Sequence, residues 1–209
     1  MCIRDRNQFP GLSSRNRRTD GTHDPGVMLD LGANIGDWTF FMASAGWRVV
    51  AVEPGYHAFA LMNATLCANK KRFGPYVRLI HAAISDDTSK HCEVCYSRAA
   101  SEVICDPQIR PDRHHCDKID TLTIRDALVR SEVANVDAFH MDIEGMECDA
   151  LKSYPEFTKR NTLSWNWIAT HHEGVRECVQ KWADKAKMTI WRPWGNNAIM
   201  TRENKWLDY

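Results

Sequence analysis

Short apolar runs alternate with helix-like segments from residue 27 onward, and this alternation restricts the fold more than any other feature. The run Val27–Leu29 is followed by a glycine turn, a helical stretch over Trp38–Ala45 and a second apolar run over Arg48–Glu53. Such runs suit strands that are buried on both faces. A strand–helix–strand repeat at this spacing predicts right-handed crossovers. We therefore expect an α/β fold with a parallel sheet and helices on both faces.

The same alternation continues along the chain with one interruption. Between Asp86 and Asp117 the sequence is polar and rich in cysteine and histidine, which predicts an irregular insertion with short strands at Cys92–Tyr96 and Glu102–Cys105. The segments Met188–Trp191 and Ala198–Thr201 predict a C-terminal β-hairpin. The other predicted strands and helices are Val77–Ile84, Val136–Met141 and Leu163–Thr170, and His57–Lys70, Ile124–Ser131, Glu147–Tyr154 and Val175–Lys187.

Residues 27–209 are expected to form a single domain, with residues 86–117 as its insertion. A chain of 209 residues is long enough to bury a core without a disulfide or a metal. Residues 1–26 are polar and broken by glycine and proline, which predicts a disordered or irregular N-terminal segment.

Charge and cysteine usage narrow the function classes. Lysine and arginine number 27 and aspartate and glutamate also number 27, so the formal net charge is zero. A nucleic-acid partner is therefore not expected. The longest uncharged stretch, Pro54–Asn69, contains polar residues, and no membrane span is predicted. The eight cysteines are scattered, with no secretory apolar segment before them, which predicts free thiols and a cytoplasmic protein.

The first predicted strand ends in the turn Asp30-x-Gly32-x-x-x-Gly36, and the second ends in Glu53. In open α/β sheets, ligands bind beyond the carboxyl ends of the strands, and an acid after the second strand reaches ribose hydroxyls. A dinucleotide site needs glycine where this chain has Asn34, because a side chain crowds the pyrophosphate. S-adenosylmethionine has no phosphate, and Asp30 would face its ammonium group. This donor is favoured over the cofactor of a nucleotide-dependent oxidoreductase.

Five motifs lie in order along the chain: MLDLGANIGD from Met28, VEP from Val52, Asn63 with Asn69, AAISD from Ala82, and MDIEGME from Met141. Together they resemble the FkbM family of methyltransferases, over roughly residues 27–202. The resemblance implies a class I methyltransferase fold, which is Rossmann-like with a mostly parallel, seven-stranded sheet. It also implies a methyltransferase that uses S-adenosylmethionine, with O-methylation of a small molecule or sugar as the expected reaction.

The resemblance and the residues together assign a donor site. It consists of Asp30, Gly32, Ala33, Asn34, Gly36 and Glu53, with Ser85 and Asp86 near the adenine by resemblance. The chain departs from the family at two places. His140 stands where the family usually has lysine, two residues before the aspartate of D-x-E-G, and Thr170-His171-His172-Glu173 stands where it often has Glu-x-His. These departures leave the predicted donor site intact.

A second cluster follows the fourth and fifth predicted strands and consists of Asp142, Glu144, His171 and His172. Methyl transfer needs two reactants held in line and a base for the acceptor proton. We expect Asp142 and Glu144 to position donor and acceptor, and His171 or His172 to act as the base. His140 is expected to be a core histidine bonded to backbone. The two carboxylates suit Mg²⁺, but no third carboxylate has an obvious spacing, so no metal is predicted.

The insertion leaves one alternative from another class of function. A C-x₂-C pair accompanied by further cysteine and histidine invites zinc. On a strand, however, positions three apart face opposite sides. A non-catalytic or zinc-stabilised binding domain is kept as the alternative function. Its candidate zinc ligands are Cys92, Cys95, Cys105, His114, His115 and Cys116.

Overall fold

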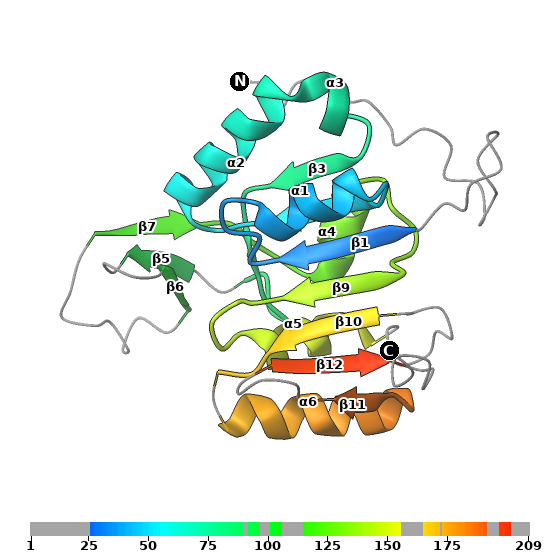
Figure 1. Cartoon of the computed structure of the whole chain (residues 1–209). Helices are drawn as coiled ribbons and strands as arrows, with labels where there is room; N and C mark the ends of the chain where they lie inside the picture. The colour runs from blue at the N-terminus through cyan, green and yellow to red at the C-terminus, as the bar shows by residue number, and fades with distance from the viewer. Residues whose placement is uncertain are drawn as a thin grey trace, which may run out of the picture.

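Seven strands form one central sheet in the computed structural model, in the order β11-β12-β10-β9-β1-β2-β3 (Figure 1). The structure describes residues 26–89, 92–96, 101–105, 115–155, 165–171, 173–191 and 197–201. The strands of this sheet are β1 (Val27–Leu31), β2 (Arg48–Val52), β3 (Val77–Ile80), β9 (Ala138–Met141), β10 (Trp165–Ala169), β11 (Thr189–Trp191) and β12 (Asn197–Thr201).

The five neighbouring strands β3, β2, β1, β9 and β10 run parallel to one another. By contrast, β12 runs antiparallel to both β10 and β11. The mostly parallel seven-stranded sheet and its C-terminal hairpin are therefore confirmed. From β1 the chain moves outward to β2 and β3, and it later returns to β9 on the other side of β1. This reversal puts the switch point of the sheet at the carboxyl ends of β1 and β9, where ligands of open α/β folds bind.

Helices cover both faces of the sheet, as predicted. Along the central strands, buried side chains alternate between the two faces of the sheet, because successive residues of a strand face opposite sides. Leu29 and Val50 belong to the core packed under α4, α5 and α6, whereas Met28 and Val49 belong to the core under α1, α2 and α3. The helices are α1 (Asp37–Ser44), α2 (Tyr56–Ala68), α3 (Lys70–Phe73), α4 (Ile124–Arg130), α5 (Glu147–Ser153) and α6 (Glu173–Ala186).

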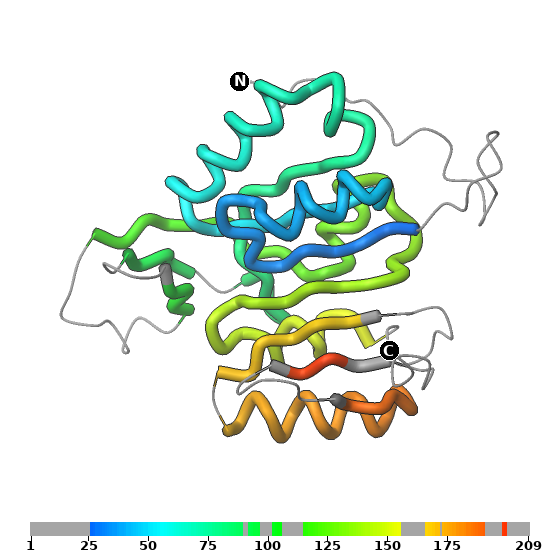
Figure 2. The backbone as a smooth tube through the Cα atoms, viewed as in Figure 1, coloured from blue at the N-terminus to red at the C-terminus, as the bar shows by residue number. Residues whose placement is uncertain are grey.

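The predicted strand Val77–Ile84 is divided in the structure. Its first half is β3, and its second half is β4 (Ala83–Ile84), which leaves the central sheet to pair with β8 (Thr121–Leu122). The insertion holds both predicted strands, β5 (Cys92–Tyr96) and β6 (Ser101–Ile104), and a third, β7 (Cys116–Ile119), that the sequence did not reveal. This small antiparallel sheet lies beyond the carboxyl ends of the parallel strands (Figure 2).

The expectation of free thiols is wrong. Cys92 is bonded to Cys105 and Cys95 to Cys116 within the small sheet. The register of the strands explains both bonds. Cys95 lies directly opposite Cys116 across β5 and β7. Cys92 and Cys105 are next to Glu93 and Ile104, which are partners across β5 and β6. Cysteines bonded in this way are not available as zinc ligands, which removes the four cysteines of the alternative zinc site. Its further candidate His114 lies outside the described residues.

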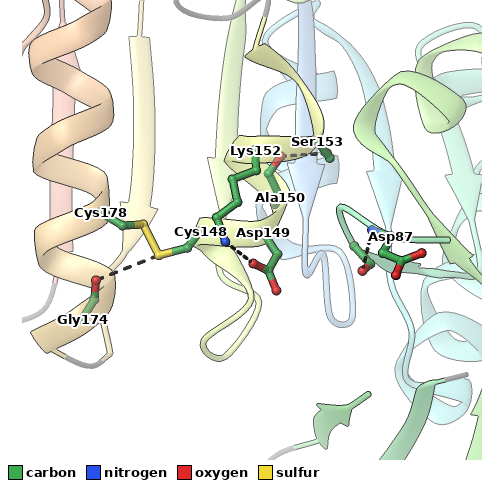
Figure 3. A network of polar contacts seen from close by, with 9 residues as sticks. Asp87, Cys148, Asp149, Ala150, Lys152, Ser153, Gly174 and Cys178 are labelled. Atoms are coloured by element: carbon green, nitrogen blue, oxygen red, sulfur yellow. Dashed lines mark hydrogen bonds and ion pairs between the residues drawn. A yellow bond between two sulfur atoms is a disulfide. The ribbon is translucent and has the colours of Figure 1, made fainter. Parts of the chain in front are cut away.

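A third disulfide, Cys148–Cys178, ties α5 to α6 (Figure 3). No cysteine in the part of the chain that the structure describes is free. The cytoplasmic location was expected because the thiols were expected to be free, so that inference loses its basis. No described helix is long and apolar enough to cross a membrane.

Replacing Cys148 and Cys178 together by serine is expected to lower the free energy of unfolding by about 2–4 kcal/mol. The bond closes a loop between cysteines 30 residues apart, and losing it gives the unfolded chain more freedom. Urea unfolding monitored by circular dichroism measures the change. Alkylation of the unfolded, unreduced wild-type protein is expected to leave both cysteines unlabelled, and labelling of either would contradict the bond.

Candidate functional site

A cavity of about 280 Å³ lies at the carboxyl ends of β1, β2, β9 and β10. Six of the residues predicted from the sequence line it, and they come from the glycine turn, the end of β2 and the segment after β9. Val103 of the small sheet also lines it, so the insertion forms part of its wall. The six predicted residues are Gly32, Ala33, Asn34, Glu53, Asp142 and Glu144.

The glycine turn is held close to the end of β9. Gly32 has φ +76°, and a Cβ atom there would lie 1.9 Å from the backbone oxygen of Asp142. Asn34 also has a positive φ, 51°, which asparagine tolerates better than most residues. Gly36 is the N-cap of α1, and a Cβ atom there would meet Phe40 and Met62. Glycine at position 32 therefore lets the turn and the end of β9 form one wall of the cavity.

Two backbone N–H groups hold the Glu53 carboxylate in place. One carboxylate oxygen accepts a hydrogen bond from the Asn34 N–H at 2.8 Å, and the other accepts one from the Gly55 N–H at 2.6 Å. Burial raises the pKa of Glu53, and the two N–H groups partly oppose this effect. A carboxylate has about four acceptor positions, so this fixed side chain retains capacity for two neighbouring hydroxyls of a ligand.

Asp30 is fully buried behind the cavity wall, rather than exposed to a ligand. Its carboxylate accepts hydrogen bonds from the Thr39 hydroxyl and from Nδ1 of His140, the latter at 2.8 Å. The expectation that His140 bonds to backbone is wrong, and the register explains why. Asp30 and His140 are paired neighbours on β1 and β9, so their side chains lie on the same face. His140 itself lines the cavity.

Aromatic rings hold His140 in place. Trp167 of β10 stacks on it with ring centroids 4.3 Å apart and an interplanar angle of 4°, and Trp38 of α1 lies 5.4 Å away. All three side chains line the cavity. Sequence reasoning did not place His140 and Trp38 in this wall, although one signal was present: His140 lies two residues before Asp142, and alternate residues of a strand share a face.

The second predicted cluster is brought together by neighbouring strands. Asp142 follows β9 and His171 follows β10, and these strands are parallel partners. Nε2 of His171 lies 2.7 Å from Oδ1 of Asp142 and 3.8 Å from Oε2 of Glu144. Burial alone would lower the pKa of His171, but the hydrogen bond to Asp142 and the charges of both carboxylates raise it above its usual value. His172 lies outside the described residues.

The same three side chains offer donor atoms that all lie within 4.8 Å of one another. His171 is a third possible ligand beside the two carboxylates, and its imidazole would suit a transition-metal ion better than Mg²⁺. In the structure the imidazole is hydrogen-bonded to Asp142. The geometry therefore supports an acid–imidazole pair at the rim of the cavity.

Ser85 and Asp86 lie next to the cavity in the chain. The cavity lining includes Ala82, Ala83 and Ile84, and the predicted pair follows immediately. Ser85 is fully buried, and its hydroxyl accepts a hydrogen bond from the Asp87 N–H at 3.2 Å. The position of this segment is set by β4, which pairs with β8.

Comparison with known proteins gives one family. A model of the methyltransferase FkbM domain matches residues 30–174. None of the curated proteins matches the sequence.

Several solved structures are similar to this chain at low sequence identity. The METTL16 methyltransferase domain has a TM-score of 0.49 and 10% identity over 85% of this chain, which spans only 60% of that structure. The precorrin-8w decarboxylase of Methanobacterium thermoautotrophicum has a TM-score of 0.48 and 12% identity, covering 83% of this chain and 78% of its own. The precorrin-6y C5,15-methyltransferase of Geobacter metallireducens has a TM-score of 0.48 and 10% identity, covering 83% of this chain and 77% of its own.

Proposed function

Because the chain belongs to the FkbM family of S-adenosylmethionine-dependent methyltransferases, we propose that it transfers a methyl group to an oxygen of a small molecule or sugar. The observation that carries this proposal is the cavity at the switch point, with a fixed carboxylate at one end and an acid–imidazole pair at the other. The donor supplies a methyl group already activated on a sulfonium. The residues therefore need to bind, align and remove a proton.

The cavity suits a donor without phosphates. Glu53 offers a fixed acceptor for the two ribose hydroxyls, and the turn Gly32-Ala33-Asn34 lines the cavity beside it. The Asn34 N–H is already donated to Glu53, which removes it as a donor to a pyrophosphate. Gly36 sets the start of α1, and Ser85 and Asp86 remain the predicted contacts of the adenine. Asp30 contributes to the donor site through His140, to which its carboxylate is hydrogen-bonded.

At the other end of the cavity, Asp142 and Glu144 would position the acceptor hydroxyl and His171 would take its proton. With Nε2–H donated to Asp142, Nδ1 is the ring nitrogen left to accept a proton. The oxygen–carbon bond forms as the sulfur–carbon bond breaks, and the proton passes to the imidazole. A positioned base of this kind contributes about 10²–10⁴-fold to a rate.

The exposed aromatic side chains near this end support an organic acceptor of moderate size. Trp38 lines the cavity and is 38% exposed, and Phe41 on the same helix is 65% exposed. Flat apolar faces of this kind suit the carbon skeleton of a sugar or a small metabolite. Tritium transfer from labelled donor to a panel of hydroxylated sugars and metabolites would identify the acceptor.

The cysteines bear on where this reaction would take place. Disulfides form and persist in oxidising compartments and are rare in the cytosol. Those between described cysteines, two in the insertion and one between α5 and α6, support a working location outside the reducing cytoplasm. We therefore propose an oxidising compartment in place of the cytoplasmic one.

Replacing Glu53 by alanine is expected to weaken binding of S-adenosylhomocysteine by at least about tenfold, because hydrogen bonds to a charged group are lost. Isothermal titration calorimetry at pH 7.5 measures this, with NADH as a ligand that should not bind. Glu177→Ala, at an exposed position on α6, is the matched control and should bind like the wild type. A folded wild-type protein that binds neither S-adenosylmethionine nor S-adenosylhomocysteine would overturn the proposed function.

A further inference from the structure

His140 combines two properties that call for a ligand. Its side chain lines the cavity yet is only 4% exposed. Its Nδ1 is bonded to Asp30, whereas its buried Nε2 has no hydrogen-bond partner among the described residues. Buried polar atoms are nearly always paired in native proteins, so an unpaired ring nitrogen beside a cavity points to a group that the cavity receives.

The surroundings decide which kind of group this is. Nδ1 of His140 lies at hydrogen-bond distance from the Asp30 carboxylate. We assign this pair the neutral imidazole that donates Nδ1–H to Asp30, in which Nε2 carries a lone pair and is an acceptor. Asp30 also places a negative charge directly behind the ring. The site therefore favours a cationic hydrogen-bond donor, and it disfavours a carboxylate.

The ring is not free to turn away from the cavity. Trp167 lies parallel to it at 4.3 Å, and Trp38 lies 5.4 Å from it and 6.2 Å from Trp167. Thr39 donates to the same Asp30 carboxylate and holds it in place. The acceptor atom thus has a fixed position at the β1–β9 side of the cavity, away from Glu53, which follows β2.

We propose that Nε2 of His140 accepts a hydrogen bond from the ammonium group of the methyl donor, and thereby positions its amino-acid end. This inference rests on the proposed function: if Glu53 binds the ribose, the amino-acid end of the donor extends toward β9. His140 is then a positioning residue that carries the charge of the buried Asp30 to the ligand. A direct contact of Asp30 with the ammonium group is replaced by a contact through the imidazole.

The test compares two ligands that differ only in the ammonium group. They are S-adenosylhomocysteine and its desamino analogue, 5′-deoxyadenosyl-4-thiobutanoate, and calorimetry gives the dissociation constant of each. In His140→Asn the amide N–H₂ can still donate to Asp30, but no atom replaces Nε2. We expect this variant to bind S-adenosylhomocysteine at least about tenfold more weakly, with the affinity for the desamino analogue unchanged. His57→Asn, at an exposed histidine, should alter neither affinity.

Two outcomes overturn the inference while the proposed function stands. Equal weakening of both ligands would give His140 a purely structural role, and unchanged affinity for both would show that Nε2 makes no contact. A wild-type protein that binds neither ligand would instead overturn the proposed function, and this inference with it.

A measurement on the wild type keeps the test open if His140→Asn does not fold, as judged by its circular dichroism spectrum. In ¹⁵N NMR spectra, S-adenosylhomocysteine should shift the Nε2 resonance of His140, and the desamino analogue should leave it in place. A shift of equal size with both ligands would contradict the proposed contact.

Discussion

Replacing His171 by alanine is expected to lower kcat by about 10²–10⁴-fold, the usual contribution of a positioned general base. The affinity for S-adenosylhomocysteine should stay nearly unchanged, because His171 is assigned to the acceptor proton and is not among the residues that line the cavity beside Glu53 and His140. Transfer of tritiated methyl groups to an acceptor found in the panel measures kcat, and calorimetry measures the affinity.

The pH profile gives this prediction a second readout. His171 can accept a proton only when it is neutral, and its pKa is raised by Asp142 and Glu144 above the ordinary value of 6.5. The wild-type rate should therefore rise with pH, with a midpoint above 6.5. In His171→Ala this limb should disappear, because the group that titrates is gone.

A matched control is available on the same protein. His115 is an exposed histidine whose Nε2 lies 3.0 Å from Asp117, so it has the same kind of partner without a place in the cavity lining. His115→Ala should leave kcat and its pH profile as they are in the wild type. A His171→Ala enzyme with wild-type kcat at every pH would show that another group takes the proton.

The sheet was predictable because its signal is local. Each buried strand is a short apolar run, and each crossover helix is an amphipathic segment, so order along the chain gives the parallel core. The Glu53 carboxylate was predictable for the same reason, since it ends a strand next to a glycine turn. What the chain does not encode locally is which residues meet across strands.

Cross-strand register accounts for the corrections. Cys92 and Cys95 lie three residues apart on β5, but their partners are 13 and 21 residues away along the chain, directly after β6 and on β7. Likewise, His140 is hydrogen-bonded to Asp30, 110 residues earlier in the chain, because β9 pairs with β1. Pairings of this range depend on topology, so sequence spacing alone could not show them.

Gly32→Ala is expected to destabilise the protein by about 2–5 kcal/mol. Two effects add: alanine at φ +76° is strained by about 1–2 kcal/mol, and the new methyl group would overlap the Asp142 backbone oxygen, which overpacking costs put at about 1–3 kcal/mol. For a chain of this size, such a loss lowers the midpoint of thermal unfolding by roughly 4–20 °C. Differential scanning calorimetry measures it.

The structural cost should be accompanied by a loss of donor binding, because relief of the overlap requires the glycine turn and the end of β9 to move apart. S-adenosylhomocysteine is then expected to bind at least about tenfold more weakly at a temperature where the variant is folded. Gly174→Ala is the matched control: a Cβ atom there meets nothing within 4 Å, and the position lies in α6, where alanine adds up to about 1 kcal/mol of stability. If Gly32→Ala were as stable as Gly174→Ala and bound the ligand equally well, the close contact between the turn and Asp142 would not be what shapes the cavity.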